Sequence, residues 1–524
     1  MNDTINTIAL NACLDAGHFI HFQCGKEVHS YSLAELDRRA GVLAACLLEL
    51  GVRVGDRVGI LGQNRVEWVI LELAILKLGG VTAGFEPGRF APQELVQRYG
   101  LKLLFGEGLT TGGPILDIEL AWKWSERPDA QPARVPLHRG YDLADIFALR
   151  FTSGSTGKPK GLEVTVGSVN SSLAAVTQMF GHGEGDNILV FVPLGCSLQQ
   201  RYWIYSAFVN GHDASISNYD DWLTTAALTS PTVVMGVPRF YEDVKAQIER
   251  SGVRVQDLQE RRRVIQQLLG GRIRYLWTGS APASRAVLDF FNDCGVPLYE
   301  GYGLTETCIV AKNCPGSFRV GSVGRVLPDK TIRFDKDGVL IVGSKIPLNS
   351  RYTWCNPGDN EKMFLPTAEI RTQDLGHVDE DGFLYIHGRV DDIVVMNSGL
   401  NVLVREIEEE IRRHRQVHEC VLFGQGKPFL TAIISAAEGG IDGASLAAHL
   451  ATWNRRCHPE QRVNAAVIVP GRFSIDNGLL TTQHKPVRKK IHACVEQELG
   501  AVYAQAQQGI LQPEQVLILE GAVQ

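Results

Sequence analysis

The sequence predicts an α/β fold in two parts: a large N-terminal body of stacked, largely parallel sheets with helices, and a small, mobile α+β domain at the C-terminus. Three observations lead to this prediction. Strand-like apolar runs alternate with helical runs through the body. The pattern changes after about Arg371, and 524 residues are more than one ordinary core accommodates. We place the domain boundary between residues 390 and 391, so that the domains span 1–390 and 391–524.

The N-terminal body begins with a predicted helix and a predicted buried strand. From Tyr31, the stretch YSLAELDRRAGVLAACLLELGV repeats apolar residues at helical spacing behind Ser32, which is a candidate N-cap. The next stretch, DRVGILGQN, predicts a short buried strand that ends in a turn. These two segments therefore start the alternation of strands and helices that the body continues.

Three later stretches each combine an apolar strand with a glycine-rich turn: PTVVMGVP, IRYLWTGSAP and VPLYEGYGLTE. In open sheets of parallel strands, ligands bind at the loops beyond the carboxyl ends of the strands. We therefore expect these three turns to contribute to one binding site.

The C-terminal part has a different pattern of predicted secondary structure. Asp381 and Gly382 lie between two β-rich runs and predict a hairpin turn. Downstream, REIEEEIRRHRQV predicts a charged helix, and HECVLFG predicts a strand. Together these segments predict a small α+β unit of roughly 130 residues, in line with an independent domain. We expect it to join the body near Gly388 to Asp392.

Composition and charge narrow the class of substrate. Hydrophobic residues make up 44% of the chain and charged residues 21%, as in ordinary globular proteins. The formal charge of −6 argues against nucleic acid as a partner and favours a small molecule. Eleven cysteines without a Cys-x-x-Cys pair indicate a reducing cytoplasm and no zinc site. The apolar run Trp68 to Phe85 contains Glu72 and Lys77, so we expect a buried helix and not an integral membrane protein.

The stretch FTSGSTGKPKG, from Phe151 to Gly161, has the composition of a phosphate-binding loop. Glycines allow unusual backbone angles, backbone N–H groups can converge on an anion, and lysine can neutralise it. The spacing does not match a Walker P-loop, and GYGLTE lacks the third glycine of a dinucleotide-binding fingerprint. Taken alone, the loop is equally consistent with phosphate binding and with a surface turn.

The order of several further motifs identifies a family. The stretches FTSGSTGKPKG, TGSAP, YEGYGLTET, RTQDLGHVDEDGFLYIHGRVDDIV, NSGLNV and NGLLTTQHKPVRKKI follow one another along the chain. This ordered set, from about Tyr31 to Ile491, resembles the adenylate-forming superfamily of acyl-CoA synthetases, peptide-synthetase adenylation domains and firefly luciferase. The resemblance implies that a carboxylic acid reacts with ATP to give acyl-adenylate and pyrophosphate. A thiol, of CoA or of a carrier protein's phosphopantetheine, then takes the acyl group.

The resemblance also implies roles for single residues that contact ATP. It assigns the phosphates to Thr152, Ser153, Gly154, Ser155, Thr156, Gly157 and Lys160, adenine to Gly279, Ser280, Ala281, Tyr302 and Gly303, and ribose or phosphate to Asp374 and Arg389. An aspartate can accept two hydrogen bonds from a ribose diol, and arginine can clamp a phosphate.

The implied catalytic residues are Thr305, Glu306 and Lys485. Thr305 would bond phosphate or the acyl carboxylate, and Glu306 would bind Mg²⁺ through oxygen. Lys485 matches the adenylation lysine of the family, whose ammonium offsets charge that builds on the α-phosphate and the acyl carboxylate. The remaining implied roles are a hinge at Asp391, contact with the thiol side at Ser398 and Gly399, and an acyl pocket near Cys196 and Gly301.

Two stretches favour a medium or long aliphatic acid, and an aromatic acid stays open as an alternative. TVVMGVPRFYEDV and VPLGCSLQQRYWIYSAFVNG, which includes Arg201, resemble segments of fatty acyl-CoA synthetases. Three positions depart from the family pattern. Cys196 or Ser197 replaces the usual histidine of the PL-x-H segment, Val166 replaces a histidine after the phosphate loop, and Gln373 replaces the glycine before Asp374.

Two alternatives stay open. The acceptor could be an acyl carrier protein, as in a carrier-protein ligase or a specialised biosynthetic ligase, because the departures lie on the acyl and thiol side. In a different class, the chain would be a catalytically silent nucleotide-binding protein. Retention of Lys485, Glu306, Asp374 and Arg389 argues against that class, because a protein without catalysis does not need all four.

Overall fold

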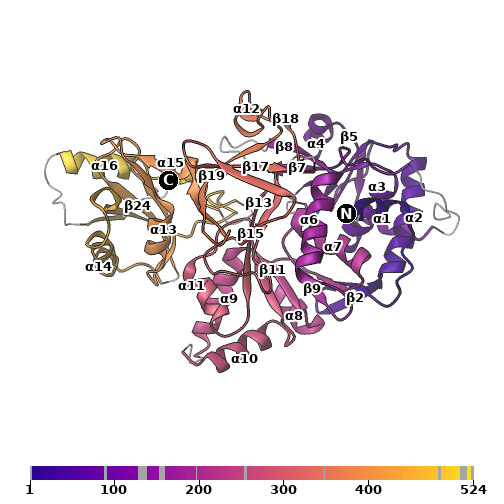
Figure 1. The fold of residues 1–524 in the computed structure, drawn as a ribbon, viewed down its shortest axis with the longest axis horizontal. Helices are drawn as coiled ribbons and strands as arrows, with labels where there is room; N and C mark the ends of the chain where they lie inside the picture. The colour runs from indigo at the N-terminus through magenta and orange to yellow at the C-terminus, as the bar shows by residue number, and fades with distance from the viewer. Residues whose placement is uncertain are drawn as a thin grey trace. The chain divides into compact units, whose positions relative to one another are not determined.

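The structure is a computed structural model that describes residues 3–85, 87, 91–127, 139–152, 160–195, 198–252, 256–346, 348–437, 439–481, 485–507 and 516–520. The chain forms two compact units: an N-terminal unit of residues 1–372 and 377–385, and a C-terminal unit of residues 373–376 and 386–524. Figure 1 draws both, with the chain running from indigo to yellow. The predicted α/β body and separate α+β domain are confirmed. The boundary between residues 390 and 391 stays a prediction, because the two units divide within a hairpin.

The larger sheet of the N-terminal unit has nine strands. In spatial order they are β15 (Arg325–Val326), β14 (Cys308–Lys312), β13 (Leu298–Leu304), β12 (Tyr275–Thr278), β11 (Val233–Gly236), β9 (Asn187–Val190), β10 (Asp213–Ile216), β1 (Phe19–Cys24) and β2 (Glu27–Ser32). The run from β13 to β1 is parallel, and the hairpins β13–β14 and β1–β2 are antiparallel. The carboxyl ends of β11, β12 and β13 therefore lie side by side, as the three strand-and-turn stretches predict.

Four helices cover part of this sheet: α8 (Trp222–Thr229), α9 (Pro238–Arg250), α10 (Leu258–Leu268) and α11 (Arg285–Asn292). Their apolar side chains, such as Val244 on α9 and Phe291 on α11, share one buried core with Val234 and Leu276 of the strands. Removing this apolar surface from water stabilises the sheet on which the site is built.

The second sheet has seven strands. In spatial order they are β18 (Tyr352–Trp354), β8 (Lys160–Thr165), β7 (Ile146–Thr152), β4 (Val81–Phe85), β3 (Arg57–Leu61), β5 (Leu101–Gly106) and β6 (Ile115–Asp117). Helices α3 (Val66–Lys77) and α4 (Pro92–Tyr99) contact this sheet, and α1 (Thr4–Leu10), α2 (Leu33–Glu49) and α5 (Glu119–Ser125) pack against α3. Helix α2 begins at the predicted cap, where the hydroxyl of Ser32 accepts from the backbone N–H of Glu35 at 3.2 Å.

Helix α3 confirms the predicted buried helix for the first part of the run from Trp68 to Phe85. For the last part of the run the prediction is wrong, because Val81–Phe85 forms strand β4. Every residue from Trp68 to Leu76 on α3 is buried. Across the part of the chain that the structure describes, no helix is both long and apolar enough to span a membrane. Two further helices, α6 (Val166–Phe180) and α7 (Leu198–Asn210), complete this region. Helix α6 contacts β8 of the seven-stranded sheet and β14 of the nine-stranded sheet, so it links the two sheets.

A smaller sheet consists of β16 (Lys330–Phe334), β17 (Val339–Ser344), β19 (Ile370–Val378) and β20 (Leu384–Arg389), and helix α12 (Asp359–Met363) precedes β19. The hairpin predicted at Asp381 and Gly382 joins β19 to β20, and Gly382 has φ 83°, where glycine carries no steric cost. Residues of this hairpin belong to both units.

The C-terminal unit contains two sheets. A short pair joins β21 (Ile393–Val395) to β22 (Asn401–Leu403), and a four-stranded sheet has the order β23 (Val417–Phe423), β24 (Leu430–Ala436), β25 (Val463–Val469) and β26 (Leu517–Glu520). The helices are η1 (Val390–Asp392), α13 (Arg405–Arg412), α14 (Gly443–Asn454), η2 (Pro459–Gln461), α15 (Arg488–Cys494) and α16 (Glu496–Gln507). The predicted charged helix and following strand are α13 and β23.

Successive side chains on each strand of the four-stranded sheet point to opposite faces, and both faces are buried. On β24, Ile434 packs with Ile407 of α13 and Leu446 of α14 in one core cluster. The adjacent Ile433 packs with Ile491 of α15 in another cluster. Helices therefore cover the sheet on both sides.

The prediction of a glycine-rich turn at EGYGL is wrong. Gly301 and Gly303 lie inside β13, and the turn to β14 comes later, between Leu304 and Cys308. A Cβ on Gly303 would collide with the carbonyl oxygen of Cys308, next to a bulge in the pairing of the two strands. Glycine is needed here because two backbones approach closely, and a turn is not the reason.

Candidate active site

The predicted phosphate loop joins β7 to β8. Thr152 is the last residue of β7, and Ser153, Gly154, Ser155, Thr156 and Gly157 lie outside the described residues. Lys160 begins β8, and its Nζ lies 3.1 Å from Oδ1 of Asp359 at the start of α12. The same Nζ lies 5.1 Å from the ring centroid of Tyr352. The end of the loop is therefore anchored to the segment that contains β18 and α12.

Glu306 lies in the turn between β13 and β14, and its side chain is tightly held. The residue is 5% exposed. The hydroxyl of Tyr352 donates a hydrogen bond of 2.5 Å to Oε1 of Glu306. Tyr352 is itself fixed, because its backbone N–H donates to Oδ1 of Asn360 at 2.7 Å, and Nδ2 of Asn360 donates back to its carbonyl at 3.0 Å. The carboxylate of Glu306 is therefore oriented before any ligand binds.

Asn349 fixes the backbone of the same turn. Its Nδ2 donates to the carbonyl oxygens of Thr305 at 2.9 Å and Glu306 at 3.1 Å. Its Oδ1 accepts from the backbone N–H of Thr165, the N-cap of α6, at 3.0 Å. The hydroxyl of Thr307 accepts from the N–H of Leu304 at 2.9 Å and closes the turn. Both predicted catalytic residues of the N-terminal unit thus lie on a rigid turn.

The residues at this turn fit a magnesium ion that is bound mainly by phosphate. Across the described ranges, no group of three or more His, Cys, Asp or Glu side chains could hold a metal ion by itself. Mg²⁺ is typically bound by one or two carboxylates together with substrate phosphates and water. Glu306 can supply one such carboxylate, since its second oxygen is not the acceptor of the Tyr352 bond.

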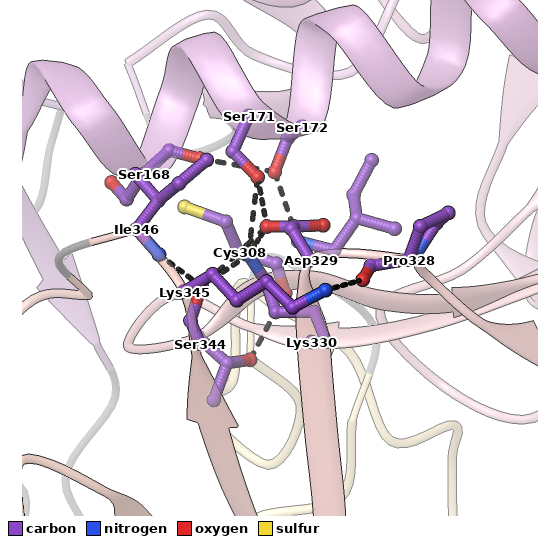
Figure 2. A network of polar contacts seen from close by, with 12 residues as sticks. Ser168, Ser171, Ser172, Cys308, Pro328, Asp329, Lys330, Ser344, Lys345 and Ile346 are labelled. Atoms are coloured by element: carbon purple, nitrogen blue, oxygen red, sulfur yellow. Dashed lines mark hydrogen bonds and ion pairs between the residues drawn. The ribbon is translucent and has the colours of Figure 1, made fainter.

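A polar network attaches α6 to the strands behind the turn (Figure 2). The hydroxyl of Ser171 donates to the carboxylate of Asp329, and Nζ of Lys330 donates to the same carboxylate at 2.5 Å. One residue further along α6, the hydroxyl of Ser172 accepts from the N–H of Ile309 on β14 at 3.3 Å. The helix therefore positions β14, which begins two residues after Glu306.

The predicted adenine contacts come from adjoining strand ends. Gly279, Ser280 and Ala281 directly follow β12, while Tyr302 and Gly303 lie on β13, which pairs with β12 in parallel. Oε1 of Glu300 on β13 accepts from the N–H of Ala283 at 3.2 Å and links the two segments. Ser280 has φ 67°, a left-handed conformation that costs a non-glycine residue energy and is enriched at functional sites. The fold thus brings two separate motifs together, and their contact with adenine stays a prediction.

The predicted acyl side lies next to Gly301. A Cβ on Gly301 would lie 3.2 Å from Nε1 of Trp277 and 3.4 Å from Nζ of Lys312. Trp277 also lines a small, mostly apolar cavity between α6, α7 and β12. The cavity is lined by Leu173, Val176, Thr177, Tyr202, Trp203, Ser206 and Trp277. Cys196 lies outside the described residues.

Arg201 belongs to the segment that resembles fatty acyl-CoA synthetases. Its side chain links α7 to α3 and β4. It is fully buried, and its NH1 donates to Oε1 of Glu72 at 3.3 Å and to the hydroxyl of Thr82 at 3.0 Å. Its Nε donates to the carbonyl of Leu194 at 3.0 Å. A buried charge needs such partners, so Arg201 is part of a structural network.

In the C-terminal unit, Asp374 and Arg389 lie opposite each other on the β19–β20 hairpin. Asp374 is 4% exposed, and its Oδ1 lies 3.8 Å from Nε of Arg389. Gln373 has φ 67°. That left-handed angle is free of strain for glycine, so glutamine holds this backbone position at some cost.

Lys485 is held through its backbone. Its N–H donates to the hydroxyl of Thr481 at 3.1 Å, and its carbonyl accepts from the N–H of Thr481 at 2.8 Å. Among the described residues, none forms a hydrogen bond or ion pair with its ammonium, and the residue is exposed by surface area. Surrounding protein nonetheless removes water, and this, with the charges of Arg389 and Arg405, lowers the pKa of Lys485 to about 8, against the opposing effect of Asp374.

Three other predicted residues of the C-terminal unit lie near its start. Asp391 lies in η1, and Ser398 and Gly399 lie in the exposed turn between β21 and β22. Gly399 has φ 84°, so the turn requires a residue that tolerates the left-handed region. Their predicted roles as hinge and thiol contacts stay predictions.

Sequence reasoning missed Tyr352, Asn349 and Asp359. All three lie in PLNSRYTWCNPGDNEK, which has no helical or strand periodicity strong enough to single them out. They reach the site because β18 pairs antiparallel with β8, far away in sequence. Only a comparison of many related sequences would have marked this stretch.

Comparison with known proteins identifies the family and several relatives of this chain. The family described as AMP-binding enzyme matches residues 11–339, and the family described as AMP-binding enzyme C-terminal domain matches residues 391–507. The long-chain-fatty-acid–CoA ligase FadD15 of Mycobacterium bovis is 28% identical over 90% of this chain and 92% of its own length. The 2-succinylbenzoate–CoA ligase of Bacillus cereus is 24% identical over 76% of this chain and 81% of its own.

Solved structures share the fold. The o-succinylbenzoate CoA synthetase MenE from Bacillus subtilis, solved with the acyl-adenylate intermediate OSB-AMP, has a TM-score of 0.75 and 20% identity, and the match covers 94% of this chain and 98% of that one. ATP-bound MatB from Rhodopseudomonas palustris has a TM-score of 0.77 and 23% identity, with 96% and 100% covered.

Proposed function

This chain belongs to the AMP-binding enzyme family, within the adenylate-forming superfamily of acyl-CoA synthetases, and from that premise we propose the reaction that it performs. It is an AMP-forming acid–CoA ligase. We propose that its acid is a medium or long aliphatic carboxylic acid. The acid reacts with ATP to give acyl-AMP and pyrophosphate, and the acyl group is then transferred to the thiol of CoA with release of AMP. The similarity to FadD15 supports an aliphatic acid.

One observation carries the proposal. Glu306 is buried, and both its carboxylate and its backbone are fixed, by Tyr352 and Asn349 respectively. The turn that carries this carboxylate follows two predicted adenine contacts on β13. A carboxylate fixed in this way is suited to bind a metal ion that is itself bound by polyphosphate. Bound Mg²⁺ would neutralise phosphate charge, and MenE has been solved with ATP and a magnesium ion.

The side chains of this chain then have separate tasks. We assign Thr305 and Lys160 to the phosphates and the acyl carboxylate, and Asp374 and Arg389 to ribose or phosphate. Lys485 stabilises the negative charge that develops when the acid attacks the α-phosphorus. The loop residues Thr152 to Gly157 and the adenine residues Gly279 to Ala281 keep the roles that the family resemblance implies.

The second half of the reaction concerns the C-terminal unit. We propose that Asp391 is the hinge between the two half-reactions and that Ser398 and Gly399 contact the thiol substrate. Both residues of the thiol pair are exposed, as such a contact requires. An acyl carrier protein is the alternative acceptor, since phosphopantetheine presents the same thiol.

An acid screen tests the proposal. The purified full chain is incubated with ATP, Mg²⁺ and a panel of aliphatic and aromatic acids, with and without CoA, and pyrophosphate release is followed by mass spectrometry of the products. We expect pyrophosphate with aliphatic acids and an acyl-CoA product. Acyl-adenylate without thioester would reject CoA as the acceptor and favour a carrier protein. Turnover of aromatic acids alone would reject the aliphatic substrate, and no pyrophosphate with any acid would reject the reaction.

A further inference from the structure

Two buried lysines in the N-terminal unit differ in one respect. Lys330 is 5% exposed, and its Nζ donates to Asp329 at 2.5 Å and to the hydroxyls of Ser171 and Ser344, both at 3.2 Å (Figure 2). Lys312 is 1% exposed, and its Nζ has no hydrogen-bond partner among the described residues. A buried polar group without a partner is costly and calls for an explanation.

The surroundings of Lys312 are aromatic. Its Nζ lies 2.9 Å from the ring centroid of Trp277 and 5.2 Å from that of Phe180, so ring faces replace part of its lost hydration. Burial holds the pKa of Lys312 well below its usual range, while Cys314 and Glu300 nearby act in the opposite direction. The amine therefore gains from any additional negative charge that reaches it.

Lys312 lies beside Gly301, which the family resemblance assigns to the acyl pocket. It is the cross-strand partner of Gly301, which has no side chain. A Cβ added to Gly301 would lie 3.4 Å from Nζ of Lys312. Trp277, which the amine contacts, also lines the cavity between α6 and α7. Thr305 lies four residues beyond Gly301, which corresponds to at most about 13 Å at about 3.3 Å per residue.

We propose that Lys312 is a substrate-binding residue that receives a second carboxylate at the far end of the acid, so that the natural substrate is an aliphatic dicarboxylic acid. This inference rests on the proposed function and specifies its substrate. The distal carboxylate accepts a charge-assisted hydrogen bond from Nζ and completes the missing pairing. A monocarboxylic acid places a methyl group there and leaves the amine as unpaired as it is in the free protein, so it gains no such bond.

Matched pairs of acids test this inference. For each chain length, one acid ends in a methyl group and the other in a carboxylate, and kcat/KM for pyrophosphate release is measured with each. The wild-type chain is expected to favour the dicarboxylic acid. In Lys312→Met, kcat/KM for the dicarboxylic acid is expected to fall about 100-fold, because truncation leaves the buried carboxylate unpaired, while the monocarboxylic acid is used as well or better. Lys312→Gln is expected to fall between the two.

Lys330→Met is the matched control, because it also removes a buried ammonium. It is expected to lower the melting temperature and to leave the ratio of the two kcat/KM values unchanged. If Lys312→Met and Lys312→Gln also leave that ratio unchanged, Lys312 is only a counter-charge for Glu300, and the inference is wrong. A wild-type preference for the monocarboxylic acid at every length would also overturn it.

Direct binding separates this inference from the proposed reaction. Calorimetric titration of each acid into the full chain, in the presence of Mg²⁺ and a nonhydrolysable ATP analogue, does not depend on turnover. Tighter binding of the dicarboxylic acid to wild type than to Lys312→Met supports the inference even if no pyrophosphate forms. Equal binding to both contradicts it even if the chain proves to be a ligase for other acids.

Discussion

Glu306 in the N-terminal unit is held at its side chain and at its backbone, whereas Lys485 in the C-terminal unit is held only through its backbone. Glu306 has a fixed direction that its neighbours determine. The ammonium of Lys485 lies at the end of a flexible side chain, so it can move between several positions with little change in free energy. We therefore expect substitutions around Glu306 to lower the adenylation rate because they disturb the geometry of the site. Substitutions at Lys485 should lower it because they remove a positive charge.

The largest expected effect is at Lys485. In Lys485→Ala, adenylation, measured by pyrophosphate exchange, is expected to fall by about 100-fold to 1,000-fold, the range seen when one donor to a developing charge is removed. Thioester formation from supplied acyl-adenylate and CoA should persist. Lys489→Ala, which removes an exposed lysine of α15, is the control and should change neither step. Equal loss of both steps in Lys485→Ala would assign the residue a general structural role.

A smaller effect is expected at Tyr352, which acts on Glu306 and is a positioning residue. Tyr352→Phe removes only the hydroxyl that orients Oε1, and we expect adenylation to fall about 10-fold to 100-fold, as for other groups that orient metal ligands. The Mg²⁺ concentration for half-maximal activity should rise. Tyr219→Phe removes a hydroxyl that donates to Asp243 far from this turn and should leave the Mg²⁺ dependence unchanged. An unaltered Mg²⁺ dependence in Tyr352→Phe would show that Glu306 does not depend on this contact.

The smallest effect is one of pH. The pKa of Lys485 is lowered from its usual value to about 8, so its ammonium predominates below that pH and is lost above it. The adenylation rate should therefore be constant below pH 8 and fall about tenfold per pH unit well above it. In Lys485→Arg the charge persists to high pH, so a slower rate with no fall is expected. A fall at the same pH in Lys485→Arg would place the titrating group elsewhere.

Much of the fold follows from the sequence. The alternation of strands and helices, the buried helix α3, the cap at Ser32 and the hairpin at Gly382 each depend on local patterns of apolar residues or on residues with special backbone angles. The glycines of β13 were misread, because the same residue serves tight turns and close strand contacts, and only the partner strand distinguishes them.

The candidate site was predictable only in part. Motif order placed Thr305, Glu306, Asp374 and Lys485, whose roles are still predictions. The side chains that support them were not predictable, because Tyr352 and Asn349 act through pairing and contacts across long stretches of chain. The unpartnered state of Lys312 was equally hidden, since a lysine in a strand is ordinarily read as solvent-exposed.

The crowding at Gly303 has a consequence for engineering. Because the neighbouring strand leaves no room for even one added carbon, any other residue at this position requires the backbone to shift, and we expect most variants in a library that randomises it to be destabilised. Sequence diversity in this region is better confined to Trp277 and the cavity wall on α6 and α7, where replacing one large side chain by another keeps the volume that the core requires.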